Sequence, residues 1–266
     1  MHAMLNIAVR AARAAGRLAV KSFNEPQHLE VQSKGLHDYV TNVDKACEQV
    51  IISTILKSYP GHQILAEESG ESGVQGDYQW IIDPIDGTTN FMRGIPHFCI
   101  SIALAYKGSV QHAVVYDPVR EELFTASRGA GAQLNGFRIR VGGGKDLNGA
   151  LLATGFPFRM KHFLPDYQAV FNKFFEQAAD IRRAGAAALD LAYVAAGRYD
   201  GFWEAGLKIW DTAAGDLLVR EAGGVVTDFG GGMNHAQSGN IVAASPRVLQ
   251  AMVTQMRPLL PESMRK

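Results

Sequence analysis

Residues 80–91 read Trp-Ile-Ile-Asp-Pro-Ile-Asp-Gly-Thr-Thr-Asn-Phe and join an apolar run to two closely spaced acids. The apolar run is typical of a buried strand, and Pro84 cannot continue the hydrogen-bond ladder of such a strand. We therefore expect the strand to end at Asp83 and a turn to follow through Asp86. Such a turn can bring both carboxylates and the Ile85 carbonyl together, and these oxygen ligands suit a hard cation such as Mg²⁺.

The residues after the second acid suit a phosphate group, which is a common partner of Mg²⁺. Gly87 lets a ligand approach the backbone closely, and Thr88-Thr89 are expected to open a short helix. The free N–H groups at a helix N-terminus bind phosphate oxygens. Asp-Pro and Asp-Gly are also common turn dipeptides, so the pattern Asp-Pro-x-Asp-Gly by itself is equally typical of a plain turn.

Apolar spacing upstream of this stretch predicts two amphipathic helices, over residues 4–23 and 44–59. Thr41 and Asp44 have the spacing of a capping box at the start of the second helix. The polar segment Lys34–Tyr39 between the helices is expected to be a mobile loop.

Short runs of strand-forming residues dominate the rest of this half, and Asn135-Gly136 is typical of a type I′ hairpin turn. We expect an antiparallel meander with both helices on one side. Its strands are expected at Gln63–Ala66, Tyr78–Ile82, Phe98–Tyr106, Val110–Tyr116 and Glu122–Ala126.

Beyond Gly142-Gly143-Gly144 strands and helices alternate, which is typical of α/β layering. This glycine run is the expected boundary between an N-terminal half, residues 1–144, and a C-terminal α/β half, residues 145–266, of one compact catalytic unit. Strands are expected at 151–153, near 181, 199–203, 225–228 and 240–244, and helices at 165–178, 186–196, 211–222 and 246–256.

Composition argues against several classes of protein. The 26 Lys and Arg residues balance 26 Asp and Glu residues, so bulk electrostatic binding of nucleic acid or of an anionic membrane is not expected. No apolar run approaches the ~18 residues of a membrane span, and arginines interrupt the N-terminal apolar residues where a signal peptide needs a continuous run. We expect a cytoplasmic protein with Cys47 and Cys99 as buried thiols.

Three further motifs accompany residues 80–91: Trp-Asp-Thr-Ala-Ala-Gly at 210–215, Glu-Ala-Gly-Gly at 221–224 and Glu-Glu-Ser-Gly at 67–70. With these motifs the chain resembles the inositol monophosphatase family over nearly its whole length. The resemblance extends to the bacterial SuhB subgroup through residues 4–8, 153–158 and 189–193. It implies an α/β fold with an α+β N-terminal half, arranged as the layered αβαβα sandwich of sugar phosphatases.

The resemblance also implies roles that the residues alone leave open, because acids at element ends are equally typical of helix caps and solvated surface. Two or three Mg²⁺ ions per site are expected as cofactors. Their expected ligands are Glu67, Asp83, the Ile85 carbonyl, Asp86 and Asp211. The expected catalytic residues are Asp44 and Thr88, which position the attacking water, and Glu67.

Substrate contacts are expected from Asp86, Gly87, Thr88, Thr89, Arg182, Gly185, Glu204 and Asp211. Lys34 corresponds to a residue near the metal entrance. Ala186 stands where many animal members of the family carry Thr, and this difference bears on which inositol phosphate is preferred.

The activity that the resemblance implies is Mg²⁺-dependent, lithium-sensitive hydrolysis of myo-inositol monophosphates by direct attack of metal-activated water. An inositol-1-monophosphatase of this kind acts on a small phosphorylated polyol and is expected to be a homodimer. One alternative is a related phosphatase for 3′-phosphoadenosine compounds or sugar bisphosphates. Another is a factor in transcription antitermination and ribosomal RNA maturation, which docks on a protein of the transcription machinery and can dispense with its phosphatase site.

Overall fold

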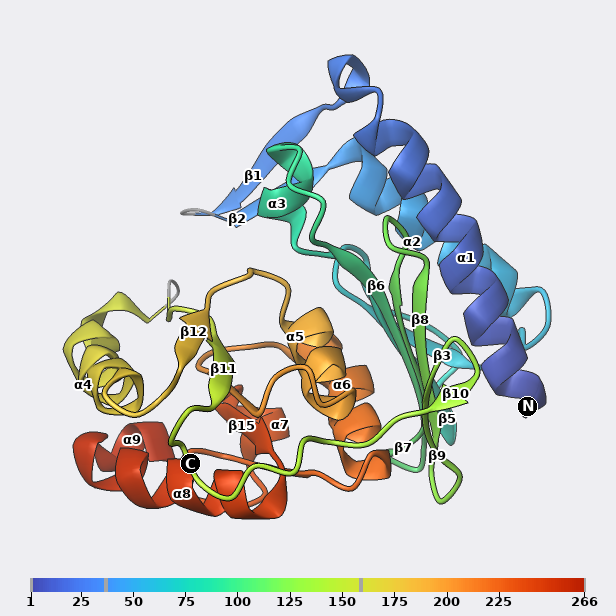
Figure 1. Ribbon diagram of the computed structural model, residues 1–266. Coiled ribbons are helices and arrows are strands. Elements are labelled where there is room, and N and C mark those ends of the chain that lie inside the picture. The colour runs from blue at the N-terminus through green and yellow to red at the C-terminus, as the bar shows by residue number, and fades with distance from the viewer. Residues whose placement is uncertain (1, 36–37, 158–159, 266) are drawn as a thin grey trace.

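The computed structural model of the 266-residue chain describes residues 2–35, 38–157 and 160–265. Helices and sheets alternate in five layers, so the expected αβαβα sandwich is confirmed (Figure 1). The layers are, in order, helices α1 (Ala3–Phe23) and α2 (Asn42–Leu56), an eight-stranded sheet, helices α5 (Ala187–Ala195) and α6 (Ile209–Glu221), a five-stranded sheet, and helices α4 (Leu164–Phe175) and α8 (Pro246–Met256).

The eight-stranded sheet contains, from one edge to the other, β10 (Phe137–Arg138), β9 (Gly131–Leu134), β8 (Glu122–Ser127), β7 (Ser109–Asp117), β6 (Cys99–Tyr106), β5 (Tyr78–Asp86), β3 (Gln63–Ala66) and β4 (Gly70–Gly73). The expected meander is confirmed from β5 to β10, where all neighbours are antiparallel. Asn135 and Gly136 both have positive φ, 50° and 85°, as a type I′ turn between β9 and β10 requires.

The expectation of a purely antiparallel sheet is wrong at β3, which pairs in parallel with β5. The cause is the edge strand β4, which the sequence analysis missed. Its residues, Gly-Glu-Ser-Gly, are mostly exposed and lack an apolar alternation. β4 runs antiparallel to β3, so the chain reverses its direction twice before β5 begins. β5 therefore runs in the same direction as β3.

The expected loop at Lys34–Tyr39 is also corrected. Strands β1 (Val31–Gly35) and β2 (Asp38–Thr41) pair as an antiparallel hairpin before α2. Val31, Gln32 and Ser33 of β1 are exposed, and the hairpin buries Val40 and Thr41 only at the end of β2, so β1 shows no alternation of apolar and polar residues in the sequence. Residues 36–37 and the side chain of Lys34 lie outside what the structure describes.

Helix α2 begins with the predicted capping box. The Thr41 hydroxyl accepts hydrogen bonds from the N–H groups of Val43 and Asp44, at 3.1 and 3.3 Å, and the Asp44 carboxylate accepts one from the Thr41 N–H at 2.9 Å. Cys47 and Cys99 are buried free thiols, as expected. Within residues 2–35, 38–157 and 160–265, no helix combines the length and apolarity needed to cross a bilayer.

The second sheet is mixed and contains, in order, β12 (Asp180–Arg182), β11 (Leu151–Thr154), β13 (Gly201–Glu204), β15 (Ile241–Ala244) and β14 (Val225–Thr227). β11 is parallel to both its neighbours and β15 is antiparallel to both. The expected elements of this half are confirmed with small shifts at their ends. Short helices complete the fold: α3 (Thr88–Met92), α7 (His235–Ser238), α9 (Glu262–Arg265) and single 3₁₀ turns at Pro26–His28, Lys161–Phe163 and Arg257–Leu259.

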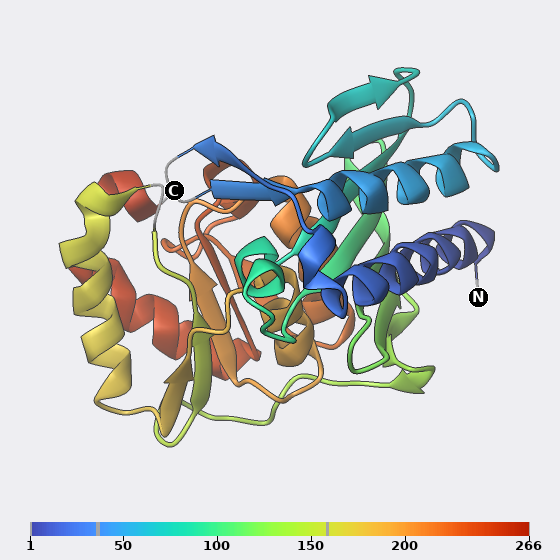
Figure 2. The same ribbon diagram turned by 90° about the horizontal axis from the view of Figure 1, so that it is seen from above.

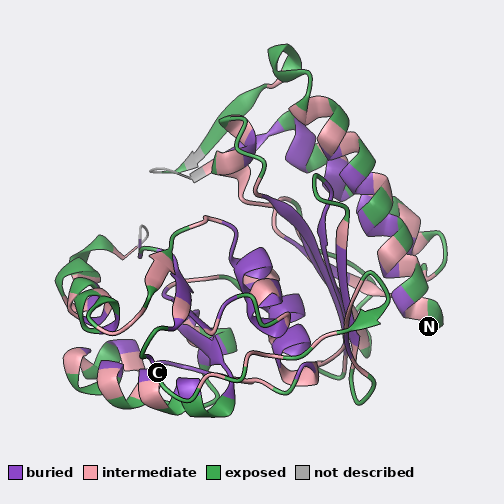
Figure 3. Cartoon of the chain, viewed as in Figure 1, coloured by how far each residue is buried: buried purple, intermediate pink, exposed green. Residues whose placement is uncertain are grey.

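Buried residues are concentrated on the inner faces of the layers, and α5 and α6 are the most completely enclosed helices in view (Figure 3). Gly215 on α6 lets these two helices approach closely. A Cβ atom at this position would lie 2.5 Å from the Cβ of Leu191 on α5, and an atom so near the backbone cannot move aside. The division of the chain at residues 142–144 stays a prediction.

We expect Gly215→Ala to lower the free energy of unfolding by about 1–3 kcal/mol, because overpacking outweighs the ~1 kcal/mol helix propensity that Ala gains over Gly. Urea unfolding measures the change. Gly61→Ala is the matched control, since nothing lies within 4 Å of a Cβ there, and it should change stability by less than about 0.5 kcal/mol. A Gly215→Ala variant as stable as the wild type would contradict the close packing of α5 on α6.

Candidate active site

An extra residue in β5 places Asp83 and Asp86 on the same face of the sheet. Side chains three residues apart in a regular strand point to opposite faces. Here Asp83 pairs with Ser101 and Asp86 pairs with Cys99, so three steps along β5 match two steps along β6. The expected end of the strand at Asp83 is therefore wrong: β5 continues through a β-bulge, where Pro84 is tolerated because the ladder is interrupted.

The chain then turns sharply at Gly87, whose φ is +98°. A Cβ on Gly87 would lie 3.1 Å from the His97 carbonyl oxygen and 3.3 Å from the Gly185 carbonyl oxygen, so glycine meets both a conformational and a steric need. Helix α3 starts at the next residue, as expected, and lies beside β2 (Figure 2).

These elements line a cleft of about 300 Å³ whose walls come from both halves of the chain. The first half contributes Tyr39, Glu67, Asp83, Ile85, Asp86, Gly87, Thr88, Thr89 and Asn90, and the second half contributes Arg183, Gly185, Ala187, Glu204, Leu207 and Asp211. The structure therefore brings together every expected metal ligand and most of the expected substrate contacts.

Asp44 lies behind the cleft wall and reaches it through Thr88. The Thr88 hydroxyl is 3.0 Å from Asp44 Oδ1 and 3.1 Å from the Ile85 carbonyl oxygen. Its single hydrogen can be donated to only one of these acceptors at a time, which leaves the oxygen lone pairs for a ligand. Burial raises the pKa of Asp44, while hydrogen bonds from Thr41 and Thr88 act in the opposite direction.

The acids of the cleft are crowded. Burial raises the pKa of Asp83 well above its ordinary value, and Glu67, Asp86 and Asp211 raise it further. Burial and Asp211 likewise raise the pKa of Asp86, although the Ala188 N–H, which donates to Asp86 Oδ2 at 2.6 Å, acts in the opposite direction. Ionised carboxylates packed in this way repel one another, and a cation between them would relieve the repulsion.

Two acids from the second half have structural contacts as well. Asp211, near the start of α6, accepts a hydrogen bond from the Lys208 N–H at 2.7 Å and so caps its helix while lining the cleft. Glu204 ends β13 and is buried against Gly155. A Cβ at Gly155 would lie 1.9 Å from Glu204 Oε1, so the space for this carboxylate depends on the glycine.

Arg182 is not among the cleft residues. It is exposed and pairs with Asp180 on the same strand, and the neighbouring Arg183 lines the cleft instead. Successive side chains of an extended chain alternate in direction, which explains why only one of the two arginines lines the cleft. A substrate contact by Arg182 stays a prediction. Phe158, in one of the motifs shared with the SuhB subgroup, lies outside the described residues.

Sequence reasoning also missed Tyr39, Asn90 and Leu207 as cleft residues. Only Asn90 carried a signal, because it belongs to the stretch 80–91. Tyr39 enters through the hairpin that was expected to be a loop, and Leu207 follows a strand whose end has no distinctive pattern.

The residues present fit Mg²⁺. The available donors are carboxylate and carbonyl oxygens, which hard divalent cations prefer, and the crowded acids supply negative charge. In the part of the chain that the structure describes, no three Asp, Glu, His or Cys residues are already gathered as a metal-binding group.

We expect Asp83→Asn to abolish stabilisation of the fold by Mg²⁺ and to raise the unfolding midpoint in EDTA, because one repelling charge is removed. Thermal unfolding in EDTA and in excess Mg²⁺ measures both effects, and ~1 kcal/mol corresponds to about 2–4 °C in a chain of this size. Asp190→Asn is the control: Asp190 is buried with a raised pKa, caused mainly by burial, but does not line the cleft. The same midpoint for the wild type in both solutions would contradict the metal assignment.

Residues 1–260 match the model of the inositol monophosphatase family. A protein named Nus factor SuhB from Escherichia coli (strain K12) is 59% identical over 267 residues, covering 100% of each chain. The solved structure of extragenic suppressor protein suhB from Bartonella henselae matches with a TM-score of 0.93 and 44% identity, over 96% of this chain and 99% of that one. Inositol monophosphatase from Anabaena matches with a TM-score of 0.86 and 39% identity, over 97% of each chain. The chain therefore belongs to the inositol monophosphatase family.

Proposed function

We propose that the cleft hydrolyses phosphate monoesters of small polyols, with myo-inositol monophosphates as substrates and Mg²⁺ as cofactor. The observation that carries this proposal is the bulge, which aligns Asp83 and Asp86 directly before the Gly87–Thr89 backbone. A cation site and a phosphate-binding backbone then share one wall. Members of this family usually depend on metal ions.

Each wall has a separate task in the proposed reaction. Glu67, Asp83, Asp86, Asp211 and the Ile85 carbonyl would hold two or three Mg²⁺ ions, which supply charge neutralisation of the phosphate and acidification of water. The Thr88 hydroxyl, oriented by Asp44, positions the attacking water opposite the leaving alcohol. Gly185, Glu204 and Asp211 face the polyol side, and Arg183 takes the place that was expected for Arg182.

Phosphate release from myo-inositol 1-phosphate tests this proposal. We expect turnover that requires Mg²⁺, falls with Li⁺, and is reduced about 10²–10⁴-fold in Thr88→Ala, because the water loses its positioning group. Thr54→Ala is the control, since that hydroxyl donates to the Val50 carbonyl within α2 and does not line the cleft. If a 3′-phosphoadenosine compound or a sugar bisphosphate is hydrolysed faster than myo-inositol 1-phosphate, that compound becomes the proposed substrate. No Mg²⁺-dependent turnover of any of these esters would overturn the hydrolase proposal.

We further propose that the protein acts in the cytoplasm as a transcription factor that docks on a protein of the transcription machinery, in antitermination and ribosomal RNA maturation. The comparisons support this role more directly than inositol phosphate hydrolysis, because the Escherichia coli relative that matches over its full length is named a Nus factor. The zero net charge favours a specific protein contact over bulk attraction to RNA. We also propose that the protein is a homodimer.

Complementation of a strain that lacks its own copy of the gene tests the docking role. We expect Asp86→Asn to restore growth and ribosomal RNA processing as well as the wild type, although it removes a ligand charge and thereby Mg²⁺-dependent turnover. The empty vector is the negative control, and immunoblotting establishes equal expression. Rescue by the wild type alone would mean that the phosphatase reaction, rather than docking, is the cellular function.

A further inference from the structure

Asn90 joins two segments that are far apart in the chain. Its Nδ2 atom donates hydrogen bonds to the carbonyl oxygens of His97 and Ala184, each at 2.8 Å. Nδ2 carries two hydrogens, so its donor capacity is fully used. One acceptor lies just before β6, and the other lies between β12 and α5 in the second half of the chain.

The segment that Asn90 holds forms part of the cleft wall. Ala184 stands between Arg183 and Gly185, which both line the cleft. Gly185 has a φ of +90°, and a Cβ there would lie 3.3 Å from Asn90 Nδ2. The Gly185 carbonyl in turn lies against Gly87, at 3.3 Å from an added Cβ. The two sides of the cleft therefore meet in direct backbone contact beside the Asn90 carboxamide.

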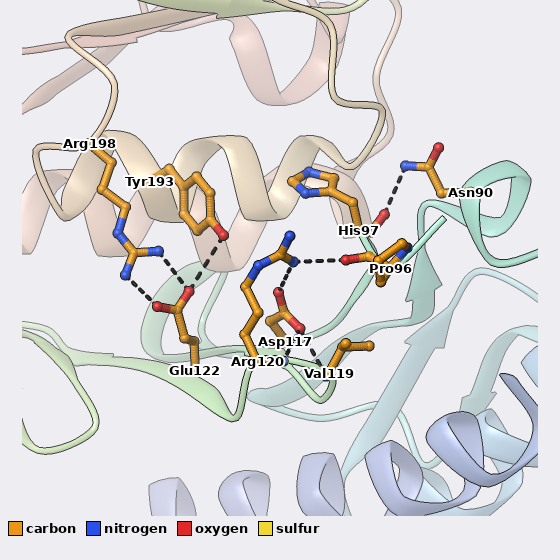
Figure 4. A network of polar contacts seen from close by, with 9 residues as sticks. All are labelled: Asn90, Pro96, His97, Asp117, Val119, Arg120, Glu122, Tyr193 and Arg198. Atoms are coloured by element: carbon orange, nitrogen blue, oxygen red, sulfur yellow. Dashed lines mark hydrogen bonds and ion pairs between the residues drawn. The ribbon is translucent and has the colours of Figure 1, made fainter. Parts of the chain in front are cut away.

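Arg120, from the turn between β7 and β8, holds the Pro96–His97 segment, which contains one of the two carbonyls that accept from Asn90 (Figure 4). Its guanidinium donates to the Pro96 carbonyl oxygen and to Asp117 Oδ2, both at 2.8 Å. Asp117 is buried, and its Oδ1 also accepts the N–H groups of Val119 and Arg120, which fixes the turn. The carbonyl oxygens that accept these hydrogen bonds from Asn90 and Arg120 belong to the adjacent residues His97 and Pro96, so the two side chains hold one peptide segment.

Helix α5 also contacts the Pro96–His97 segment and the start of β8, directly after this turn. Tyr193 on α5 contacts the ring of His97 edge-on, with ring centroids 6.2 Å apart, and its hydroxyl is 3.4 Å from Glu122 Oε2. Glu122 also pairs with Arg198, beyond the end of α5 (Figure 4). Through Tyr193, the His97 segment and the start of β8 in the first sheet both contact α5. Helix α5 is the helix that directly follows the 183–185 segment.

We propose that Asn90 is a positioning residue that sets the separation between the phosphate side of the cleft and the side that holds the alcohol, with Arg120 as its support. This inference rests on the proposed phosphatase function. Asp83, Asp86 and Thr88 have other anchors, in the bulge, in the Ala188 N–H and in Asp44. The Asn90 bond therefore acts chiefly on the 183–185 wall, which faces the part of the substrate beyond the phosphate.

The test compares two phosphate esters that place different demands on that wall. The ratio of kcat/KM for myo-inositol 1-phosphate to kcat/KM for p-nitrophenyl phosphate is measured with Mg²⁺, since p-nitrophenol is a good leaving group and needs little positioning. We expect Asn90→Ala to lower this ratio about 10- to 100-fold, mainly through KM for the inositol ester. Asn148→Ala, on an exposed loop outside the cleft, should leave the ratio unchanged.

Arg120→Ala should lower the ratio in the same direction but less, because it removes only the support. The double variant should lose less than the product of the two single losses, since both residues act through one segment. An equal loss for both esters in Asn90→Ala would overturn the inference and leave a general structural role. Multiplicative effects of the two variants would overturn the support by Arg120.

A readout without turnover separates this inference from the proposed function. Amide hydrogen exchange of residues 183–188 should be faster in Asn90→Ala than in the wild type, while exchange in α1 stays unchanged. Unchanged exchange at 183–188 would overturn the inference even if the enzyme is active. A wild type that hydrolyses neither ester would instead overturn the proposed function, and the exchange result would still show whether Asn90 holds the wall.

Discussion

The cleft depends on the one extra residue that β5 carries opposite β6. Without it, Asp83 and Asp86 would point to opposite faces of the sheet, one toward α2 and one toward α6. With it, both carboxylates reach the layer between the sheets, where Glu67 and Asp211 complete an acidic wall. The bulge also delivers the chain to Gly87, whose positive φ starts the turn into α3. The proposed metal ligands Asp83 and Asp86 and the proposed phosphate-binding backbone are therefore placed by one local irregularity.

The layered sandwich explains why acidic residues from distant parts of the sequence meet at the cleft. The first sheet contributes the ends of β3 and β5, and the second half contributes the end of β13 and the start of α6. Gly215 permits the close packing of α5 on α6, the two helices between the sheets. The short bond between Asp86 and the Ala188 N–H and the carboxamide of Asn90 connect the two halves directly at the cleft.

Periodic apolar patterns predicted the main helices and the alternation of strands and helices in the second half, and the stretch 80–91 indicated a cation site at Asp83, Ile85 and Asp86. The layered sandwich and the roles of Glu67 and Asp211 came from the resemblance to the family, and the ligand set stays a prediction. The sequence did not predict the bulge, since a register shift arises from pairing with β6 and leaves no mark on β5 alone. Strands β1 and β4 were missed because their described residues are mostly exposed, and β2 was missed because it is only four residues long. The sequence also could not show that Arg183 rather than Arg182 lines the cleft, because tertiary contacts set the direction of a side chain at the end of a short strand.

The most direct test of this account is a crystal structure of the protein grown with Mn²⁺, an ion that replaces Mg²⁺ and is located by its anomalous scattering. We expect a peak held by the carboxylates of Asp83 and Asp86 and the Ile85 carbonyl, with Glu67 or Asp211 completing the ligand set. An empty cleft at saturating Mn²⁺, or an ion bound only elsewhere, would contradict the claim that the bulge in β5 assembles a metal site.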